Sequence, residues 1–141
     1  MSQTSVLITG AYGLIGNIVY SHLCSYPKRY EVYGLARRRQ PSSRIQGDRL
    51  LAIPDDRFAL VDLTDWNGMR EAVQGMNTVV HMAANPNQDA GWDSVLQSNI
   101  TGTYHVLEAS RQAGVQRVIV ASSVQVNFGY AEYRYLRNTC Y

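Results

Sequence analysis

Five short apolar runs alternate along the chain with stretches of helical periodicity. The runs read as strands buried on both faces of a sheet, and they lie at Ser5–Thr9, Glu31–Ala36, Phe58–Val61, Thr78–Ala83 and Arg117–Ala121. Between the second and third runs, residues 40–57 predict an irregular segment with at most a short helix around Arg49–Ala52. Strands that alternate with helices predict an α/β fold built on a parallel sheet.

The helix expected after the first strand carries its large apolar residues at helical spacing. Ile15, Ile18, Val19 and Leu23 would form one face, and Pro27 would stop the helix. We therefore expect this face to pack on the sheet.

The helix expected after the third strand has signals at both ends. Asp65 can cap its first turn, and Gly75 can end it. Its inner face would be Trp66, Met69 and Val73.

A longer helix is predicted between the fourth and fifth strands, from Ser94 to Ala113. Ser94 and Gln97 have the spacing of a capping box, and Gly114 follows the last turn.

Three glycines follow the first strand at intervals of three residues, directly before the first helix. Gly10 can form the tight turn, Gly13 lets the backbone approach a ligand, and Gly16 lets helix and strand pack closely. A turn of this kind can place a pyrophosphate on the free N–H groups at a helix N-terminus. The alternative is an ordinary glycine-rich turn.

Right-handed crossovers predict the strand order 3-2-1-4-5, a doubly wound Rossmann-type sheet that reverses between its first and fourth strands. A dinucleotide is expected at that reversal, over the carboxyl ends of the strands. We expect the sheet to be truncated after the fifth strand, with residues 1–126 forming the nucleotide-binding domain. Residues 127–141 would be an irregular tail, with no substrate domain.

Composition narrows the class of protein. The 141 residues are 45% hydrophobic and 17% charged with a net charge of +2, which is typical of a globular domain and does not indicate a nucleic-acid partner. No apolar run approaches the length of a membrane span and no targeting segment precedes the first strand, so we expect a cytoplasmic protein that is not bound to a membrane.

Cysteine and histidine do not indicate a metal site. Cys24 and Cys140 are too few for a disulfide framework and lack zinc-site spacing. His22, His81 and His105 share no ligand spacing, and we expect His81 to be a hydrogen-bonded histidine of the core.

Arginines crowd the region after the second strand, where an acidic residue would bind the ribose 2′-hydroxyl of NAD. No acid is present there; Arg37 and Arg38 follow the strand instead and can pair with a 2′-phosphate. This predicts a preference for NADP, with NAD as the other possible cofactor. The alternative is a solvated basic loop.

Several motifs of this chain occur in the order found in a known family. The chain resembles the extended short-chain dehydrogenase/reductases, specifically the NAD(P)-dependent epimerase/dehydratase group that acts on sugars. The motifs are Thr9-Gly10-x-x-Gly13-x-x-Gly16, Asp62-Leu63-Thr64-Asp65, His81-Met82-Ala83-Ala84, Asn99-x-x-Gly102-Thr103 and Ser122-Ser123-x-x-Val126.

The resemblance implies a set of cofactor-binding residues. They are Gly10, Tyr12, Gly13, Leu14, Ile15, Gly16, Arg37, Arg38, Asp62, Leu63, Ala83, Ala84, Asn99 and Ser122. It implies that Asp62 accepts a hydrogen bond from the adenine amino group, although a plain turn aspartate is the alternative. Ala83 and Ala84 would let the backbone approach the cofactor, or would serve packing alone.

The resemblance also implies two residues of the catalytic site. Ser123 looks like the family serine whose hydroxyl bonds the reacting oxygen of the substrate, with its neighbour Ser122 as the alternative. Both serines could equally be strand-end caps. Asn99 would support the active-site hydrogen-bond network, or would be a structural amide within its helix.

The chain departs from the family where its acid/base pair is expected. A Tyr-x-x-x-Lys pair is absent from the 141 residues; Tyr130 and Tyr133 are each followed four residues later by an arginine. Val126-Asn127-Phe128-Gly129 also differs from the family's usual Val-Tyr-Gly by one residue.

Two hypotheses follow from this departure. One is the NAD(P)-binding portion of a sugar epimerase, dehydratase or dehydrogenase, a fragment that is incomplete for catalysis. The other is a non-catalytic dinucleotide-binding module or truncated gene product. A sugar or nucleotide-sugar substrate suits the polar loop at residues 85–93. The resemblance implies that the long helix joins a dimer interface with a later helix, but that later helix has no counterpart in these 141 residues, so homodimerisation stays open.

Overall fold

A single parallel sheet forms the centre of the computed structural model, which describes residues 2–43, 45 and 51–123. In these residues the strands are β1 (Thr4–Thr9), β2 (Tyr30–Ala36), β3 (Phe58–Leu60), β4 (Thr78–His81) and β5 (Arg117–Val120). Their order is β3-β2-β1-β4-β5, and each neighbouring pair is parallel. The predicted fold class and strand order are confirmed.

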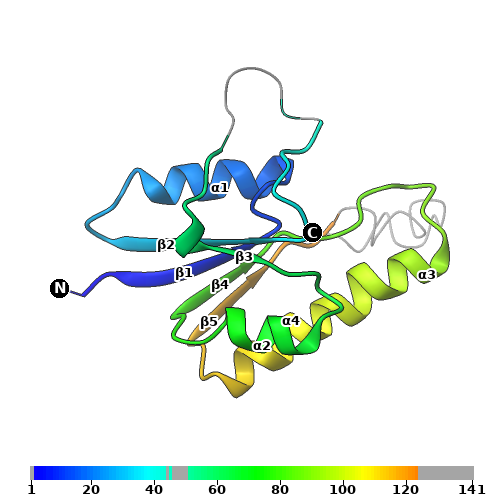
Figure 1. Ribbon diagram of the computed structural model, residues 1–141. Coiled ribbons are helices and arrows are strands. Elements are labelled where there is room, and N and C mark those ends of the chain that lie inside the picture. Colours follow the sequence, from blue (N-terminus) through cyan, green and yellow to red (C-terminus); the bar gives the residue numbers. More distant parts are fainter. Residues whose placement is uncertain (1, 44, 46–50, 124–141) are drawn as a thin grey trace, which may run out of the picture.

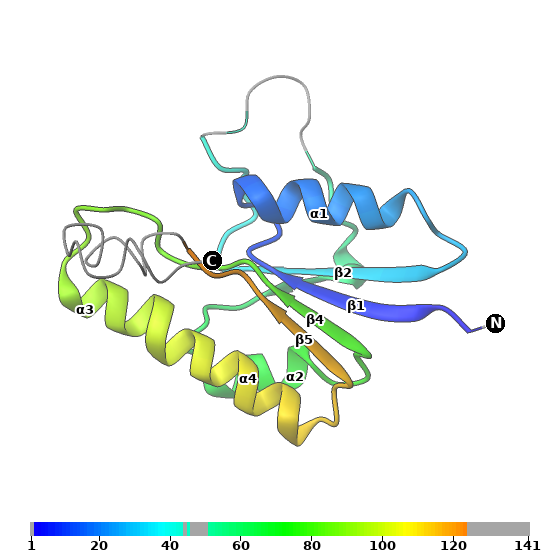
Figure 2. The same ribbon diagram turned by 180° about the vertical axis from the view of Figure 1, so that it is seen from behind.

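Helices cover both faces of this sheet (Figures 1 and 2). Helix α1 (Leu14–Cys24) lies on one face, where Ile8 and Val32 belong to its core. Helices α2 (Trp66–Ala72) and α4 (Gly102–Gln112) lie on the other face, where Leu7 and Leu35 are buried. Alternate residues of β1 thus enter opposite cores, as in a strand buried on both sides.

The face by which α1 packs on the sheet differs from the predicted one. Ile15 and Ile18 are each 59% exposed, while Gly16, Asn17 and Tyr20 are buried. Val19 and Leu23 do pack against the core. The side of the helix that carries Gly16 lies against the glycine turn, where a Cβ would meet the Gly10 carbonyl, and this orientation leaves the two isoleucines exposed.

Helix α2 follows its prediction. The Asp65 carboxylate accepts a hydrogen bond from the Gly68 N–H at 3.0 Å and so caps the helix. Met69 and Val73 are fully buried, and Trp66 packs beside them. Gly75 follows the helix with a φ of +72°, which suits a glycine.

The long helix begins two residues before and ends one residue before its predicted span, and its beginning and its interior differ from the prediction. It consists of α3 (Trp92–Val95), a π-helical turn η2 (Leu96–Thr101) and α4. The predicted capping box at Ser94 is wrong, because Gly91 is the N-cap residue and has no side chain to bond. The Ser94 hydroxyl instead accepts a hydrogen bond from the Asn85 side chain at 2.8 Å.

The segment between β2 and β3 has a 3-10 turn, η1 (Asp55–Arg57), directly before β3. The short helix predicted around residues 49–52 falls partly outside the described residues, and Leu51 and Ala52 are not helical. Val126 and the predicted tail at residues 127–141 also lie outside them. In the described part of the chain, every helix is too short or too polar to cross a membrane.

Candidate functional site

The glycine turn between β1 and α1 leaves no space for side chains at two positions. Gly10 has a φ of +69°, and a Cβ there would lie 2.9 Å from the backbone nitrogen of Ala83. A Cβ on Gly16 would lie 2.8 Å from the carbonyl carbon of Gly10. The ends of β1 and β4 and the start of α1 are therefore in backbone contact.

The first turn of α1 presents free amide groups next to these glycines. Gly13 precedes the helix in an extended conformation and provides no side-chain cap. Within the residues that the structure describes, no acceptor is recorded for the N–H groups of Leu14, Ile15 and Gly16. Unpaired N–H groups at a helix N-terminus, together with the helix dipole, favour an anion such as a phosphate.

Tyr12 connects the glycine turn to the loop after β2. Its ring is buried and meets Phe58 edge-on, with the ring centroids 5.3 Å apart. Its carbonyl accepts a hydrogen bond from the Ser42 N–H at 2.9 Å. The Tyr12 side chain is thus part of the core.

The three consecutive arginines after β2 have different environments. Arg39 pairs with Asp55, and its guanidinium lies over the Phe58 ring, 4.6 Å from the centroid. Arg37 and Arg38 are exposed, and no ion pair is recorded for either in the described part of the chain. Arg37 and Arg38 are therefore available to a phosphate, whereas Arg39 is already engaged.

Asp62 begins the turn after β3. One of its carboxylate oxygens, Oδ1, accepts hydrogen bonds from the backbone N–H of Thr64 at 2.9 Å and from the Thr64 hydroxyl at 2.8 Å. The Thr64 backbone bond is the main cause that lowers the pKa of Asp62, and the nearby charge of Arg37 lowers that pKa further. The turn role considered for Asp62 is present, and no hydrogen bond is recorded for its other oxygen, Oδ2, among the described residues.

A buried hydrogen-bond chain joins β1, β4 and α4. The Thr9 hydroxyl lies 2.7 Å from His81 Nδ1, and His81 Nε2 lies 3.0 Å from the Thr103 hydroxyl. Thr9 Oγ1 also accepts from the N–H groups of Met82 and Ala83, at 3.2 and 3.3 Å. His81 is thus a hydrogen-bonded histidine of the core, as predicted.

This chain of bonds also defines the state of His81. Because the Thr9 oxygen already accepts two N–H groups, its own proton is free to point at His81 Nδ1. His81 then carries its proton on Nε2 and donates it to Thr103. Burial lowers the pKa of His81, in agreement with a neutral ring.

Asn99 lies in the π-helical turn η2 and holds the loop after β4. Its Oδ1 accepts from the Asn85 N–H at 2.7 Å, and its Nδ2 donates to the Asn85 carbonyl at 3.1 Å. Asn99 therefore fixes the backbone that directly follows Ala83 and Ala84. Ala83 is half-buried, and Ala84 is exposed.

Ser122 and Ser123 follow β5 after one residue, at the same edge of the sheet, and both are exposed. The preceding Ala121 donates its N–H to the His81 carbonyl at 3.0 Å. The chain leading to both serines is thus fixed beside β4.

Sequence reasoning did not assign roles at this edge to Thr9, Asn85, Thr103 and His105. Thr9 and Thr103 stand within the quoted motifs, which is the signal that points to them. His105 Nδ1 donates to the Leu63 carbonyl at 2.7 Å, a contact between residues 42 positions apart that no local pattern reveals.

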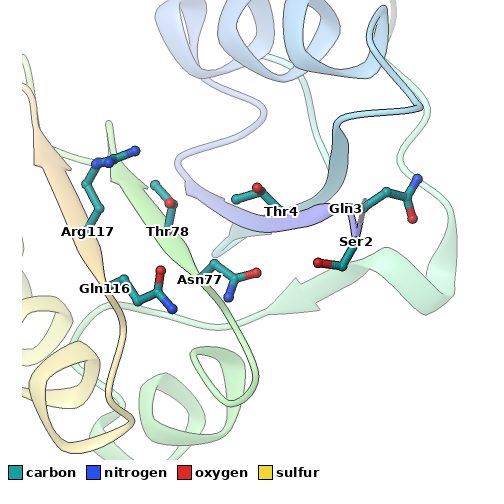
Figure 3. A pocket seen from close by; sticks show the side chains of 7 residues that line it. All are labelled: Ser2, Gln3, Thr4, Asn77, Thr78, Gln116 and Arg117. Carbon is teal, nitrogen blue, oxygen red and sulfur yellow. The ribbon is translucent and has the colours of Figure 1, made fainter.

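The opposite edge of the sheet has a different surface. A polar hollow of about 390 Å³ lies there, beside the starts of β1, β4 and β5 (Figure 3). It is lined by Ser2, Gln3, Thr4, Asn77, Thr78, Gln116 and Arg117. The hollow includes none of the glycine-turn residues, so the candidate site is defined by N–H groups without a recorded acceptor in the described residues and not by this pocket.

Comparison with known proteins agrees with this geometry. The family model for the NAD dependent epimerase/dehydratase family matches residues 6–132. The chain belongs to this family.

Relatives of this family member include sugar dehydrogenases. It is 34% identical, over 89% of its length, to an L-arabinose 1-dehydrogenase (NAD(P)(+)) of Haloferax volcanii. It covers 43% of that enzyme, and so spans about two fifths of the relative's length.

Solved structures show the same fold. A uronate dehydrogenase variant of Agrobacterium tumefaciens, complexed with NAD, superposes with a TM-score of 0.67 at 27% identity. The match covers 86% of this chain and 42% of that one. MoeE5 in complex with UDP-glucose and NAD superposes with a TM-score of 0.69 at 33% identity, over 86% of this chain and 37% of MoeE5.

Proposed function

We propose that this family member binds a nicotinamide dinucleotide at the carboxyl edge of its sheet and prefers NADP to NAD. The observation that carries the proposal is the set of free N–H groups on Leu14, Ile15 and Gly16, beside glycines that cannot carry a side chain. A pyrophosphate suits these N–H groups because it is negatively charged and because the glycines let it come close to the backbone. The relatives whose names include NAD or NAD(P) support this ligand class.

The preference for NADP is supported by the charges beside these N–H groups. Arg37 and Arg38 are exposed without ion pairs in the described residues, and the segment 37–43 contains no acid that would bind a ribose 2′-hydroxyl. A guanidinium binds a 2′-phosphate through charge-assisted hydrogen bonds. Asp62, near Arg37, would accept a bond from the adenine amino group through Oδ2.

We further propose that the chain is the cofactor-binding part of an oxidoreductase, epimerase or dehydratase for sugars or nucleotide sugars. When bound, the nicotinamide supplies hydride transfer. Ser123 would bond the reacting oxygen of the substrate, and Asn99 would hold the loop after β4 in place. Because Tyr-x-x-x-Lys is absent from the 141 residues, we expect these residues alone to bind cofactor without oxidising a sugar. If a sugar substrate reduces the nicotinamide in the presence of these residues, as measured by absorbance, this expectation is contradicted.

Calorimetric titration of the chain with NADP and with NAD tests the proposed cofactor. We expect NADP to bind about tenfold more tightly, the effect of one added charge-assisted contact. Arg37→Ala should remove most of this difference and leave the affinity for NAD within about twofold. Arg117→Ala is the matched control, because this arginine lies at the opposite edge of the sheet (Figure 3). Equal affinities of the unaltered chain would refute the preference, and no binding of either dinucleotide would refute the proposed function.

A further inference from the structure

The turn after β3 is held by the helix that passes beneath it. Leu63 is nearly buried, and its carbonyl lies 2.7 Å from His105 Nδ1 on α4. A carbonyl oxygen can only accept, so His105 is the donor. Gly102 lies one turn earlier, and a Cβ there would come 2.7 Å from the Leu63 Cβ. The helix thus touches this turn both by packing and by a hydrogen bond.

The His105 ring is itself fixed. It lies 5.4 Å from the Trp66 ring, centroid to centroid, at an interplanar angle of 55°. Trp66 is the first residue of α2, which Asp65 caps. The donor nitrogen is therefore held between two helices, and a hydrogen bond from a fixed donor restricts the acceptor more than one from a mobile side chain.

The orientation of Asp62 depends on this same turn. Both hydrogen bonds from Thr64 go to Oδ1, and the Asp65 N–H donates to the Asp62 carbonyl at 2.9 Å. These bonds fix the carboxylate relative to its own backbone. The direction of Oδ2 then depends on the contacts that hold the whole turn against the rest of the protein. His105 provides one of these contacts, at Leu63, the residue after Asp62.

We propose that His105 is a positioning residue for the adenine end of the dinucleotide. By holding the Leu63 carbonyl, His105 keeps the turn in the position from which Asp62 Oδ2 accepts a hydrogen bond from the adenine amino group. This inference rests on the proposed function, because it requires a dinucleotide to occupy the site. It adds a recognition role for a residue that touches neither substrate nor cofactor.

The test compares NADP with nicotinamide hypoxanthine dinucleotide phosphate, in which the adenine amino group is replaced by oxygen. A general loss of stability would weaken both ligands, whereas a misplaced Asp62 would weaken only the selection for adenine. We expect the unaltered chain to bind NADP about tenfold more tightly, as one hydrogen bond to a charged group provides. Calorimetry gives both dissociation constants and therefore their ratio.

Three substitutions at His105 separate its roles. His105→Phe keeps an aromatic ring against Trp66 but has no donor, and the affinity ratio should fall to about twofold or less. His105→Leu gives a second donor-free variant if the phenylalanine variant does not fold. His105→Asn places an amide N–H at the same number of bonds from Cβ as Nδ1 and should restore the ratio. Leu107→Ala, at an exposed residue of the same helix, is the matched control and should keep the ratio unchanged.

The outcomes are distinct. An unaltered ratio in both folded donor-free variants overturns the role of His105 while the proposed function stands. Equal binding of the two ligands by the unaltered chain overturns the adenine contact and this inference with it. If neither ligand binds the unaltered chain, the proposed function itself fails.

Discussion

The two edges of the sheet differ in how deeply their polar side chains are buried. At the carboxyl edge, Thr9 and His81 are buried and bond to segments from other parts of the chain. At the amino edge, Gln3, Gln116 and Arg117 are exposed around a polar hollow. Buried polar groups must keep their partners, because an unpaired one is costly, so they fix the loops that they bond. The loops at the carboxyl edge are therefore held by buried side-chain hydrogen bonds, while the amino edge combines a buried Thr78 and a half-buried Asn77 with several exposed polar side chains.

The largest expected effect is a loss of NADP affinity when a side chain is placed between the glycine turn and α1. Gly16→Val should weaken NADP binding by about 100-fold or more, because its Cβ would displace the Gly10 carbonyl and with it the free amides. Calorimetry measures the loss, and circular dichroism verifies the fold. Ile18→Ala, exposed on the same helix, should bind normally. Normal affinity in Gly16→Val would show that this edge is not the binding site.

The next largest expected effect is a loss of stability, and it differs between two threonines of β1. Thr9→Val keeps the shape but leaves His81 Nδ1 and the Ala83 N–H without their partner, while the Met82 N–H keeps the Thr9 carbonyl as an acceptor; the substitution should lower the free energy of unfolding by about 2–3 kcal/mol. Thr4→Val, at the amino end of β1, should change it by less than about 0.5 kcal/mol. Urea denaturation measures both. Equal losses would remove the distinction between the edges.

A smaller expected effect is the change of stability with pH. Burial places the folded-state pKa of His81 below its unfolded value of about 6.5, so below that pH the unfolded chain binds more protons. This contribution to stability is complete above the unfolded-state pKa and is lost as pH falls toward the lower folded-state pKa. Between pH 7.5 and 5.5 the loss should reach about 1 kcal/mol per pH unit at most.

Urea denaturation across this range tests the assignment to His81. His81→Gln should flatten the dependence, because glutamine does not titrate. His22→Gln, at an exposed histidine of α1, should retain it. A slope that survives in His81→Gln would assign the titration to another group.

The smallest effect is expected at the amino edge. Asn77 Oδ1 accepts the Ser5 N–H at 2.9 Å, so Asn77→Ala should cost about 1 kcal/mol of stability. Because this residue lies at the opposite edge from the glycine turn, NADP affinity should stay within about twofold. A marked loss of affinity in this variant would mean that the two edges are energetically coupled.

The strands and their order could be predicted because apolar runs and right-handed crossovers are local or general rules. The buried face of α1 could not be predicted from periodicity. Ile15 and Ile18 have helical spacing with Val19, but the sheet-facing side is chosen by the contact of Gly16 with Gly10, which periodicity does not contain.

The candidate site likewise has parts that the sequence predicts and parts that it does not. The glycine turn is visible in sequence because its glycines follow a strand and precede a helix. The arginine run predicts a phosphate partner but not the engagement of Arg39 by Asp55 and Phe58. The bonds from Thr9 to His81 and from His105 to Leu63 join residues 72 and 42 positions apart, and such pairs appear only once the chain is folded.

The π-helical turn η2 holds one residue more than regular α-helical winding would need between α3 and α4. Deleting one residue between Leu96 and Thr101 would therefore restore α-helical hydrogen bonding, and the two helices would keep their relative rotation. Ser94 would stay beside Asn85, and Thr103 would stay at His81. The same deletion in the middle of α4 would instead rotate the helix on one side of it by about 100°.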